Sequence, residues 1–342
     1  MNLPVRIDSS CPKTGVIAVD GAWGSSGLNL SHWPGNTTPL DLVHKLSTGC
    51  ALRFAKLPER ERLERAGDAA AIVNNHYDTD GVMALFATRF PALGLEHETQ
   101  ILAAAAAGDF FREPNTRAIA LDALVTRFVD PLHSEAARSL EQASADERHT
   151  ELTLQLLDEL PDLLIAQELP YPELWRPVVE RADLDRDELS GTAREESETL
   201  DLCSIHSSVP WRSVGPGRHT LFGSTDCDRV LAIAPHPSGG HSVRLIVSTQ
   251  SWFVPACHNR LVRPDLERLA DTLNQLDPHA SVDDQMWRAQ SQRNASPELW
   301  FGTADIASFA EHSEALRPTE LPLTVIREHI YAALKQPNRQ TV

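Results

Sequence analysis

One short stretch of the chain gathers residue types that bind divalent metal ions. His76, Asp78 and Asp80 occupy alternate positions, and Gly81 follows them. In an extended segment alternate side chains face the same side, so we expect the imidazole and the two carboxylates to project together. Such a set suits manganese, iron or magnesium, and two ions could share it. The alternative is a polar loop whose aspartates cap the next helix.

Two predicted strands position this turn. Residues 69–75 form an apolar run that leads directly into the turn, and a helix with one apolar face follows at 82–90. A second apolar run, at 16–19, ends at Asp20. Ligands of open α/β sheets gather at the carboxyl ends of the strands. We therefore expect Asp20 to lie near the turn and to join the metal ligands.

A second group of polar residues lies in the loop that follows the first predicted strand. Loops built from His, Trp and Asn often carry function. We expect His32 to be catalytic, Trp33 to stack on a flat ligand and Asn36 to contact the substrate. The alternative is a structured loop in which Trp33 forms its own small core.

The order of predicted elements indicates an α/β chain in three parts. Residues 1–131 are expected to form an open, mostly parallel sheet with helices, including helices over 39–46 and 101–107. Residues 132–200 predict an acidic helical segment, and residues 201–342 predict a smaller α+β domain. The predicted metal site thus belongs to the first part.

The composition limits the class of partner. The chain has 342 residues and a formal net charge of -17, which repels phosphate backbones and disfavours a nucleic-acid surface. No apolar run reaches the roughly 18 residues of a membrane helix. Because the N-terminus also lacks a signal pattern, we expect a cytoplasmic protein with no membrane partner. A small molecule is the expected substrate, and a homo-oligomer is left open.

Residues 71–82 resemble the first motif of the DHH phosphoesterase superfamily, in which an apolar strand precedes a histidine, a D-x-D-G stretch and a helix. Members of that superfamily hydrolyse phosphoester or phosphoanhydride bonds with two metal ions, commonly manganese. The resemblance implies that His76, Asp78 and Asp80 are metal ligands. It also implies that Asp109 stands where the aspartate of the second motif does. Manganese is the expected ion, with magnesium, iron and zinc as alternatives.

The chain departs from that pattern because it contains no Asp-His-His triplet. We expect His32 to replace the missing histidine, with Asp20 as a bridging carboxylate. The expected catalytic residues are then Asp80, His32 and Asp109, and the last is also a predicted metal ligand.

Two further residues are assigned to the substrate. Arg112, just after Asp109, can pair with a phosphate or a carboxylate, although a surface arginine is an equal alternative. His241 follows two glycines in a stretch that resembles the glycine-rich, histidine-containing substrate motif of the same superfamily.

Over its whole length the chain also resembles an uncharacterised bacterial protein family. The resemblance is carried by residues 19–21, 30–39, 46–49 and 76–81. It implies no activity.

The leading hypothesis is a metal-dependent hydrolase of a small phosphate ester or anhydride, and two other functions stay open. One is a non-catalytic protein whose loops bind a metal or a small ligand. The other is a phosphatase similar to the haloacid dehalogenases, with Asp78 as nucleophile and Asp80 as acid and base. That chemistry needs the apolar strand to run straight into the first aspartate, whereas residues 74–77 intervene, and Lys335 is poorly placed to assist.

Overall fold

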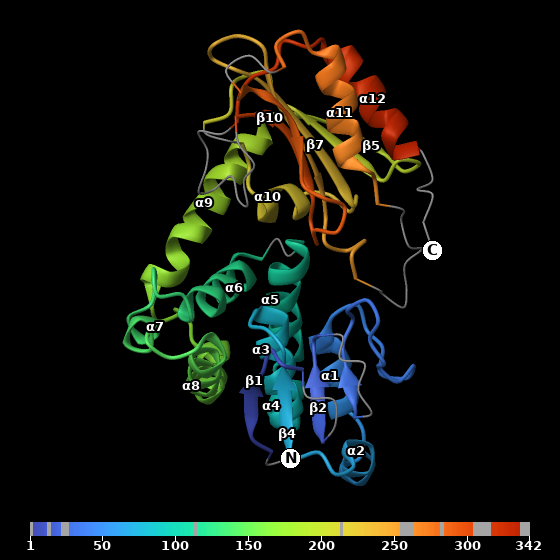
Figure 1. Ribbon diagram of the computed structural model, residues 1–342. Coiled ribbons are helices and arrows are strands. Elements are labelled where there is room, and N and C mark those ends of the chain that lie inside the picture. The colour runs from blue at the N-terminus through green and yellow to red at the C-terminus, as the bar shows by residue number, and fades with distance from the viewer. Residues whose placement is uncertain are drawn as a thin grey trace. The chain divides into compact units, whose positions relative to one another are not determined.

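A computed structural model describes residues 3–11, 15–21, 27–112, 115–212, 215–253, 263–280, 284–303 and 316–335. Over these residues the chain is a mixed α/β protein, as the sequence predicts (Figure 1). It divides into two units, of which unit 1 comprises Met1–Arg181 and Phe253–Asn259, and unit 2 comprises Ala182–Trp252 and Arg260–Val342. The main division therefore follows Arg181, whereas the sequence predicts boundaries after residues 131 and 200.

A small parallel sheet forms the base of unit 1. Its strands are β1 (Val5–Ile7), β2 (Val16–Val19), β3 (Asn29–Leu30) and β4 (Ala71–Asn74), in the spatial order β1-β4-β2-β3. Each pairing is parallel, and Ala18 lies opposite Val73 in the central pair β2–β4. Every residue of β2 and β4 is buried, which explains why their sequences are apolar rather than alternating. The predicted parallel sheet is therefore confirmed.

Helices pack on this sheet and on one another. They are α1 (Ser47–Ala55), α2 (Glu59–Ala66), α3 (Thr79–Arg89), α4 (Pro91–Glu96), α5 (Glu98–Phe110), α6 (Thr116–Phe128), α7 (Glu135–Ser139), α8 (Ala145–Ile165) and the first half of α9 (Pro172–Ser190). The helix α3 lies against both α1 and α5, and α5 lies against α6. Apolar residues lie on more than one face of α3, which is buried along almost its whole length.

One predicted helix begins later than expected. Residues 39–46 form turns and irregular backbone, and α1 begins only at Ser47. The hydroxyl of Thr38 does not cap a helix, because it donates to the carbonyl oxygen of Ser31 at 2.7 Å and accepts from the Ser31 N–H. Thr38 therefore closes the preceding loop.

Another predicted helix is longer than expected. The helix assigned to 101–107 continues as α5 through Gly108 and Asp109. A Cβ atom at Gly108 would lie 2.7 Å from Asp122 Oδ1, so the glycine permits α5 and α6 to approach closely. The close approach of α6 therefore explains a glycine within α5, at a position where the sequence suggests that the helix ends.

A mixed sheet forms unit 2. Its strands are β5 (Ala193–Ser197), β6 (Leu202–His206), β7 (Arg229–Pro235), β8 (His241–Val247), β9 (Met286–Ala289) and β10 (Glu298–Gly302), in the order β5-β6-β7-β8-β10-β9. Only the pair β6–β7 is parallel among the described strands of this sheet. Two helices, α11 (Leu266–Leu276) and α12 (Leu323–Lys335), cover one face, and α10 (Arg218–Phe222) is a short helix (Figure 1). The predicted α+β character of this part is confirmed.

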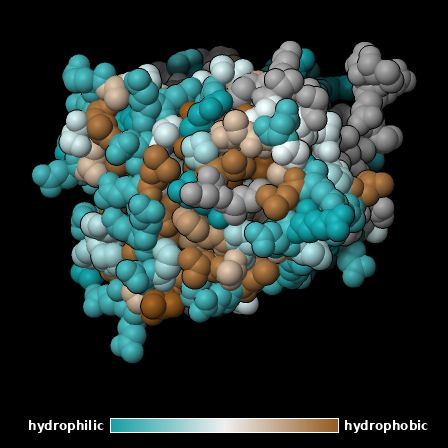
Figure 2. All heavy atoms as spheres, turned by 90° about the horizontal axis from the view of Figure 1, so that it is seen from below, coloured by the Kyte–Doolittle hydropathy of each residue, from teal (hydrophilic) through white to brown (hydrophobic). Residues whose placement is uncertain are grey.

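Figure 2 shows the polar and apolar side chains on one face of the molecule. On the face that Figure 2 shows, hydrophilic side chains predominate and hydrophobic ones gather toward the middle. Large apolar side chains exposed among the described residues include Leu40, Leu132 and Ile165. None of the described helices combines the length and the apolar character needed to cross a bilayer.

Candidate metal centre

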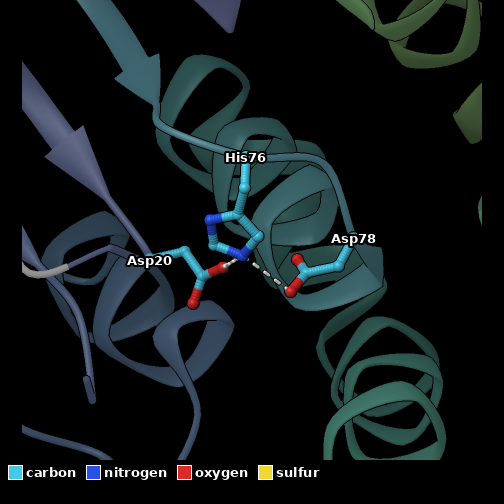
Figure 3. A group of neighbouring side chains, drawn as sticks. All are labelled: Asp20, His76 and Asp78. Atoms are coloured by element: carbon cyan, nitrogen blue, oxygen red, sulfur yellow. Dashed lines mark hydrogen bonds and ion pairs between the residues drawn. The ribbon is translucent and has the colours of Figure 1, made fainter. Parts of the chain in front are cut away.

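The carboxyl ends of β2 and β4 bring predicted metal ligands together. The two strands are parallel neighbours, so the chain leaves both at the same edge of the sheet. Asp20 follows β2, His76 follows β4, and Asp78 precedes α3. Figure 3 shows the three side chains directed at one another. The convergence expected from the sequence is therefore present.

Asp20, His76 and Asp78 form one group, which we call the outer half-site because His76 and Asp78 are partly exposed. His76 Nε2 lies 3.0 Å from Asp20 Oδ2 and 2.8 Å from Asp78 Oδ2. His76 Nδ1 lies 2.7 Å from Asn75 Oδ1, which can only accept, so Nδ1 donates and Nε2 is directed at the carboxylates.

In the outer half-site His76 and Asp78 form a charged pair. Burial lowers the pKa of His76, but Asp78 and Asp20 outweigh it and raise that pKa to about 12. Burial raises the pKa of Asp78, but the charge of His76 outweighs it and lowers that pKa to about 2. The imidazole is therefore a cation that offsets part of the negative charge of the group, and a divalent ion would take the place of its Nε2 proton.

Asp20, His32 and Asp80 form a second group, which we call the inner half-site because all three side chains are fully buried. His32 Nε2 lies 3.6 Å from Asp20 Oδ1, 3.5 Å from Asp80 Oδ2 and 3.1 Å from Asp109 Oδ2. His32 Nδ1 lies 2.7 Å from the carbonyl oxygen of Lys45, so Nδ1 donates and Nε2 faces the carboxylates. This Nε2 has no hydrogen-bond partner among the described residues.

The ring of His32 is also fixed by packing. It stacks on Phe253, with the ring centroids 3.7 Å apart, and meets Phe110 edge to face. The two aromatic contacts and the hydrogen bond to Lys45 together hold the ring with its Nε2 toward the carboxylates. The direction of that nitrogen is therefore built into the fold.

Asp20 belongs to both half-sites. Its Oδ2 faces His76 and its Oδ1 faces His32. The residue has a φ of 56°, in the left-handed region that aspartate tolerates better than most residues, at a cost of order 1 kcal/mol. A Cβ atom on Gly21 would lie 2.4 Å from Asn75 Oδ1, so the following glycine lets the two strand ends approach. Burial, followed by the charge of Asp78, raises the pKa of Asp20.

The first turn of α1 holds the carboxylates of the inner half-site. The backbone N–H groups of Ser47 and Thr48 donate to Asp80 Oδ2 and Oδ1 at 2.7 Å and 2.8 Å. Ser47 Oγ donates to Asp20 Oδ1 at 2.7 Å, and Trp33 Nε1 donates to the same oxygen at 3.1 Å. Donors from a helix N-terminus favour ionised carboxylates and fix their orientation. Ser47 and Thr48 are not among the site residues predicted from the sequence, although a Ser-Thr pair opening a helix is a signal for such a role.

Asp78 caps the next helix, α3, as the alternative interpretation expects, whereas Asp80 accepts from the N-terminus of an earlier helix, α1. Asp78 Oδ1 accepts from the N–H of Gly81 at 2.8 Å, and Asp80 accepts from the first turn of α1. Each carboxylate oxygen has two acceptor positions, however, and capping uses only one of them. Capping and metal binding are therefore compatible at these two residues.

The sequence matches a protein-family model over almost its whole length. The model of a family of unknown function, DUF6687, matches residues 6–341. The chain belongs to this family. No curated protein and no solved structure matches the chain. Both half-sites lie within the matched residues, and the family's description assigns no activity to them.

The other predicted site residues have different surroundings. The Trp33 ring lies beside His76, with centroids 4.9 Å apart. Asn36 donates to the Trp33 carbonyl oxygen at 2.7 Å and accepts from the N–H of Thr38, so its side chain holds the loop together. Arg112 follows the end of α5, and His241 begins β8 in unit 2. Substrate contacts by these four residues stay predictions.

A buried carboxyl on α6 supports the turn. Thr79 Oγ1 donates to Asp122 Oδ1 at 2.5 Å. Burial raises the pKa of Asp122 to about 6, from 3.8, against the smaller lowering by Thr79. Because the folded value lies above the unfolded one, the stability that this group contributes is fully present below pH 3.8 and is lost as the pH rises through 6.

Asp122→Asn should therefore change the pH dependence of stability. The amide cannot titrate, so the free energy of unfolding of the variant, relative to the native chain, should rise between about pH 4 and about pH 7, by on the order of 2 kcal/mol. Urea unfolding at both pH values, with a chelator present throughout, measures this. An equal difference between the two proteins at both pH values would contradict the raised pKa.

Proposed function

We propose that the chain is a metal-dependent hydrolase that cleaves a small phosphate ester or anhydride. The environment of His32 supports this most strongly. Its Nε2 is buried, lacks a hydrogen-bond partner among the described residues and faces Asp20, Asp80 and Asp109. Buried polar atoms ordinarily have hydrogen-bond partners, and a divalent cation would be a shared partner for the imidazole and these carboxylates.

Two ions suit the donor atoms. Asp20 offers one oxygen to each half-site, and within each half-site the ligand atoms lie within 4.8 Å of one another. Each half-site supplies one imidazole and two carboxylates, a set that serves manganese, iron, magnesium or zinc. We propose manganese, because the ligands are mostly oxygen atoms and because residues 71–82 resemble the first DHH motif. Asp109 is the proposed additional ligand of the inner half-site.

The residues of the two half-sites have different roles in the proposed reaction. When bound, divalent ions polarise a phosphoryl oxygen and make water a stronger nucleophile near neutral pH. Asp20 sets the spacing of the half-sites, since Ser47 and Trp33 hold its carboxylate. His76 and Asp78 form the side that a substrate reaches, because they alone are partly exposed among the residues of the two half-sites. The net charge of -17 supports a small substrate rather than a nucleic acid.

The resemblance to the DHH superfamily fits this arrangement. In the proposal, His32 takes the role of the histidine in the absent Asp-His-His triplet, and Asp20 is the bridging carboxylate. Both lie at the edge of the sheet where β2 and β4 end, beside the turn that carries the resembling motif.

The two alternatives receive less support. A nucleophilic Asp78 would need an apolar strand to run straight into it, yet β4 ends at Asn74 and residues 75–77 intervene. A non-catalytic metal-binding protein is favoured by one observation, the complete burial of the inner half-site. An enzyme requires a site that its substrate can reach, and the partial exposure of the outer half-site meets this requirement. A metal-binding protein does not require such exposure.

Turnover assays on purified, manganese-loaded protein test the proposal. The substrates are p-nitrophenyl phosphate, its bis-ester, pyrophosphate and a small set of nucleotides. Asp78→Asn should lower kcat/KM by roughly 100-fold or more, since a lost ligand removes several kcal/mol of transition-state stabilisation. Asp158→Asn, the same change at an exposed position of α8, should leave it unaltered. Stoichiometric metal without turnover of any substrate would contradict a hydrolase and favour a binding protein.

A further inference from the structure

The two half-sites differ in how far water reaches them. In the outer half-site, the side chains of His76 and Asp78 are 29% and 35% exposed. In the inner half-site, the side chains of Asp20, His32 and Asp80 are fully buried. An ion in the inner half-site could leave only when part of unit 1 opens, whereas an ion in the outer half-site is within reach of solvent.

Hydrogen bonds from the protein also favour the inner half-site. Ser47 and Thr48 together donate three hydrogen bonds to the carboxylates of Asp80 and Asp20. In the outer half-site one side chain, Asn75, orients the imidazole, and one backbone N–H of α3 binds the aspartate. Such partners orient metal ligands and commonly change metal affinity by about 10–100-fold.

The metal-free states differ as well. In the outer half-site His76 Nε2 is hydrogen-bonded to Asp78 Oδ2 at 2.8 Å, although Asp20 Oδ2 has no hydrogen-bond partner among the described residues. In the inner half-site His32 Nε2 has no hydrogen-bond partner among the described residues. An ion in the outer half-site must displace the hydrogen bond between His76 and Asp78, whereas an ion in the inner half-site displaces no hydrogen bond of His32 Nε2.

We propose that the inner half-site keeps its ion as a fixed part of the fold, while the outer half-site exchanges its ion with the solution. The supply of free divalent metal then switches the activity on and off by filling the outer half-site alone. This inference rests on the proposed function, because the switch requires that turnover depend on both ions.

Metal release from the native chain tests the inference without any activity measurement. The protein is loaded with manganese alone, mixed with a chelator, and its remaining manganese is measured over time by elemental analysis. We expect two phases of equal amplitude that differ at least about tenfold in rate, the slow one limited by opening of unit 1. Release of both ions in a single phase would overturn the inference and leave the proposed function standing. Absence of bound manganese after loading would overturn both.

Two matched substitutions assign the phases. Ser47→Ala should accelerate the slow phase by about 10–100-fold and leave the fast phase nearly unchanged, because its hydroxyl donates to the inner oxygen of Asp20 and accepts from the backbone N–H of His32, both in the inner half-site. Asn75→Ala should accelerate only the fast phase, because it orients His76. Circular dichroism shows whether each variant is folded, and the result on the native chain stands without them. Equal effects of both substitutions on both phases would contradict the assignment.

Discussion

Asp20→Asn is expected to make the metal-free protein more stable and the metal-loaded protein less stable than the native chain. Asp20 is fully buried near the carboxylates of Asp78 and Asp80, and burial raises its pKa. Asparagine removes the buried charge, tolerates the left-handed backbone and keeps an oxygen for Ser47 and Trp33. We expect a gain of about 1–3 kcal/mol in the free energy of unfolding without metal.

With manganese the order should reverse. The native chain gains about 4 kcal/mol when free metal stands at 1,000 times its dissociation constant, whereas the variant has lost a ligand of both half-sites. Urea unfolding with chelator and with manganese measures both conditions. Asp78→Asn is the matched control, because it removes a ligand from the outer half-site only and should still bind one ion. A loss of stability that is the same with and without metal would show Asp20 to be purely structural.

Metal removal is expected to loosen unit 1 and to leave unit 2 unchanged. The residues of both half-sites, and Asp109 beside them, belong to unit 1. Ligands that bind only the folded state protect the slowly exchanging amides of the unit that holds them, by up to the same 4 kcal/mol or about 1,000-fold in exchange rate. Hydrogen–deuterium exchange of β2, α1 and α3, with and without manganese, measures this.

Unit 2 provides the internal control in the same sample. Peptides from β7, β8 and α11 should exchange at equal rates in both conditions. A change of similar size in both units would point to a general effect of metal on the chain, and no change in unit 1 would argue against metal binding at the half-sites.

Sequence patterns were sufficient for the outer half-site. The apolar runs that became β2 and β4 and the turn before α3 were predictable, because buried parallel strands leave a continuous apolar signature. Once both strands were assigned to one parallel sheet, the meeting of Asp20 with His76 and Asp78 followed from the direction of the strands. Local sequence therefore carried most of this geometry.

The support of the inner half-site could not be predicted in the same way. The strand that leads to His32, β3, has only two residues, too few for a period to be visible. Thr48, in the first turn of α1, donates to Asp80, which lies 32 positions later in the sequence. No local signal predicts a contact at that separation. The expected helix over 39–46 also hid the true start of α1, because Thr38 closes the loop through Ser31 instead of capping a helix.

The most direct test of the metal centre is anomalous X-ray diffraction from crystals of the manganese-loaded protein, recorded at the manganese absorption edge. We expect two anomalous peaks, one among Asp20, His32 and Asp80 and one among Asp20, His76 and Asp78. Well-ordered side chains at these positions with no anomalous peak, in crystals grown with excess manganese, would contradict the proposed metal centre.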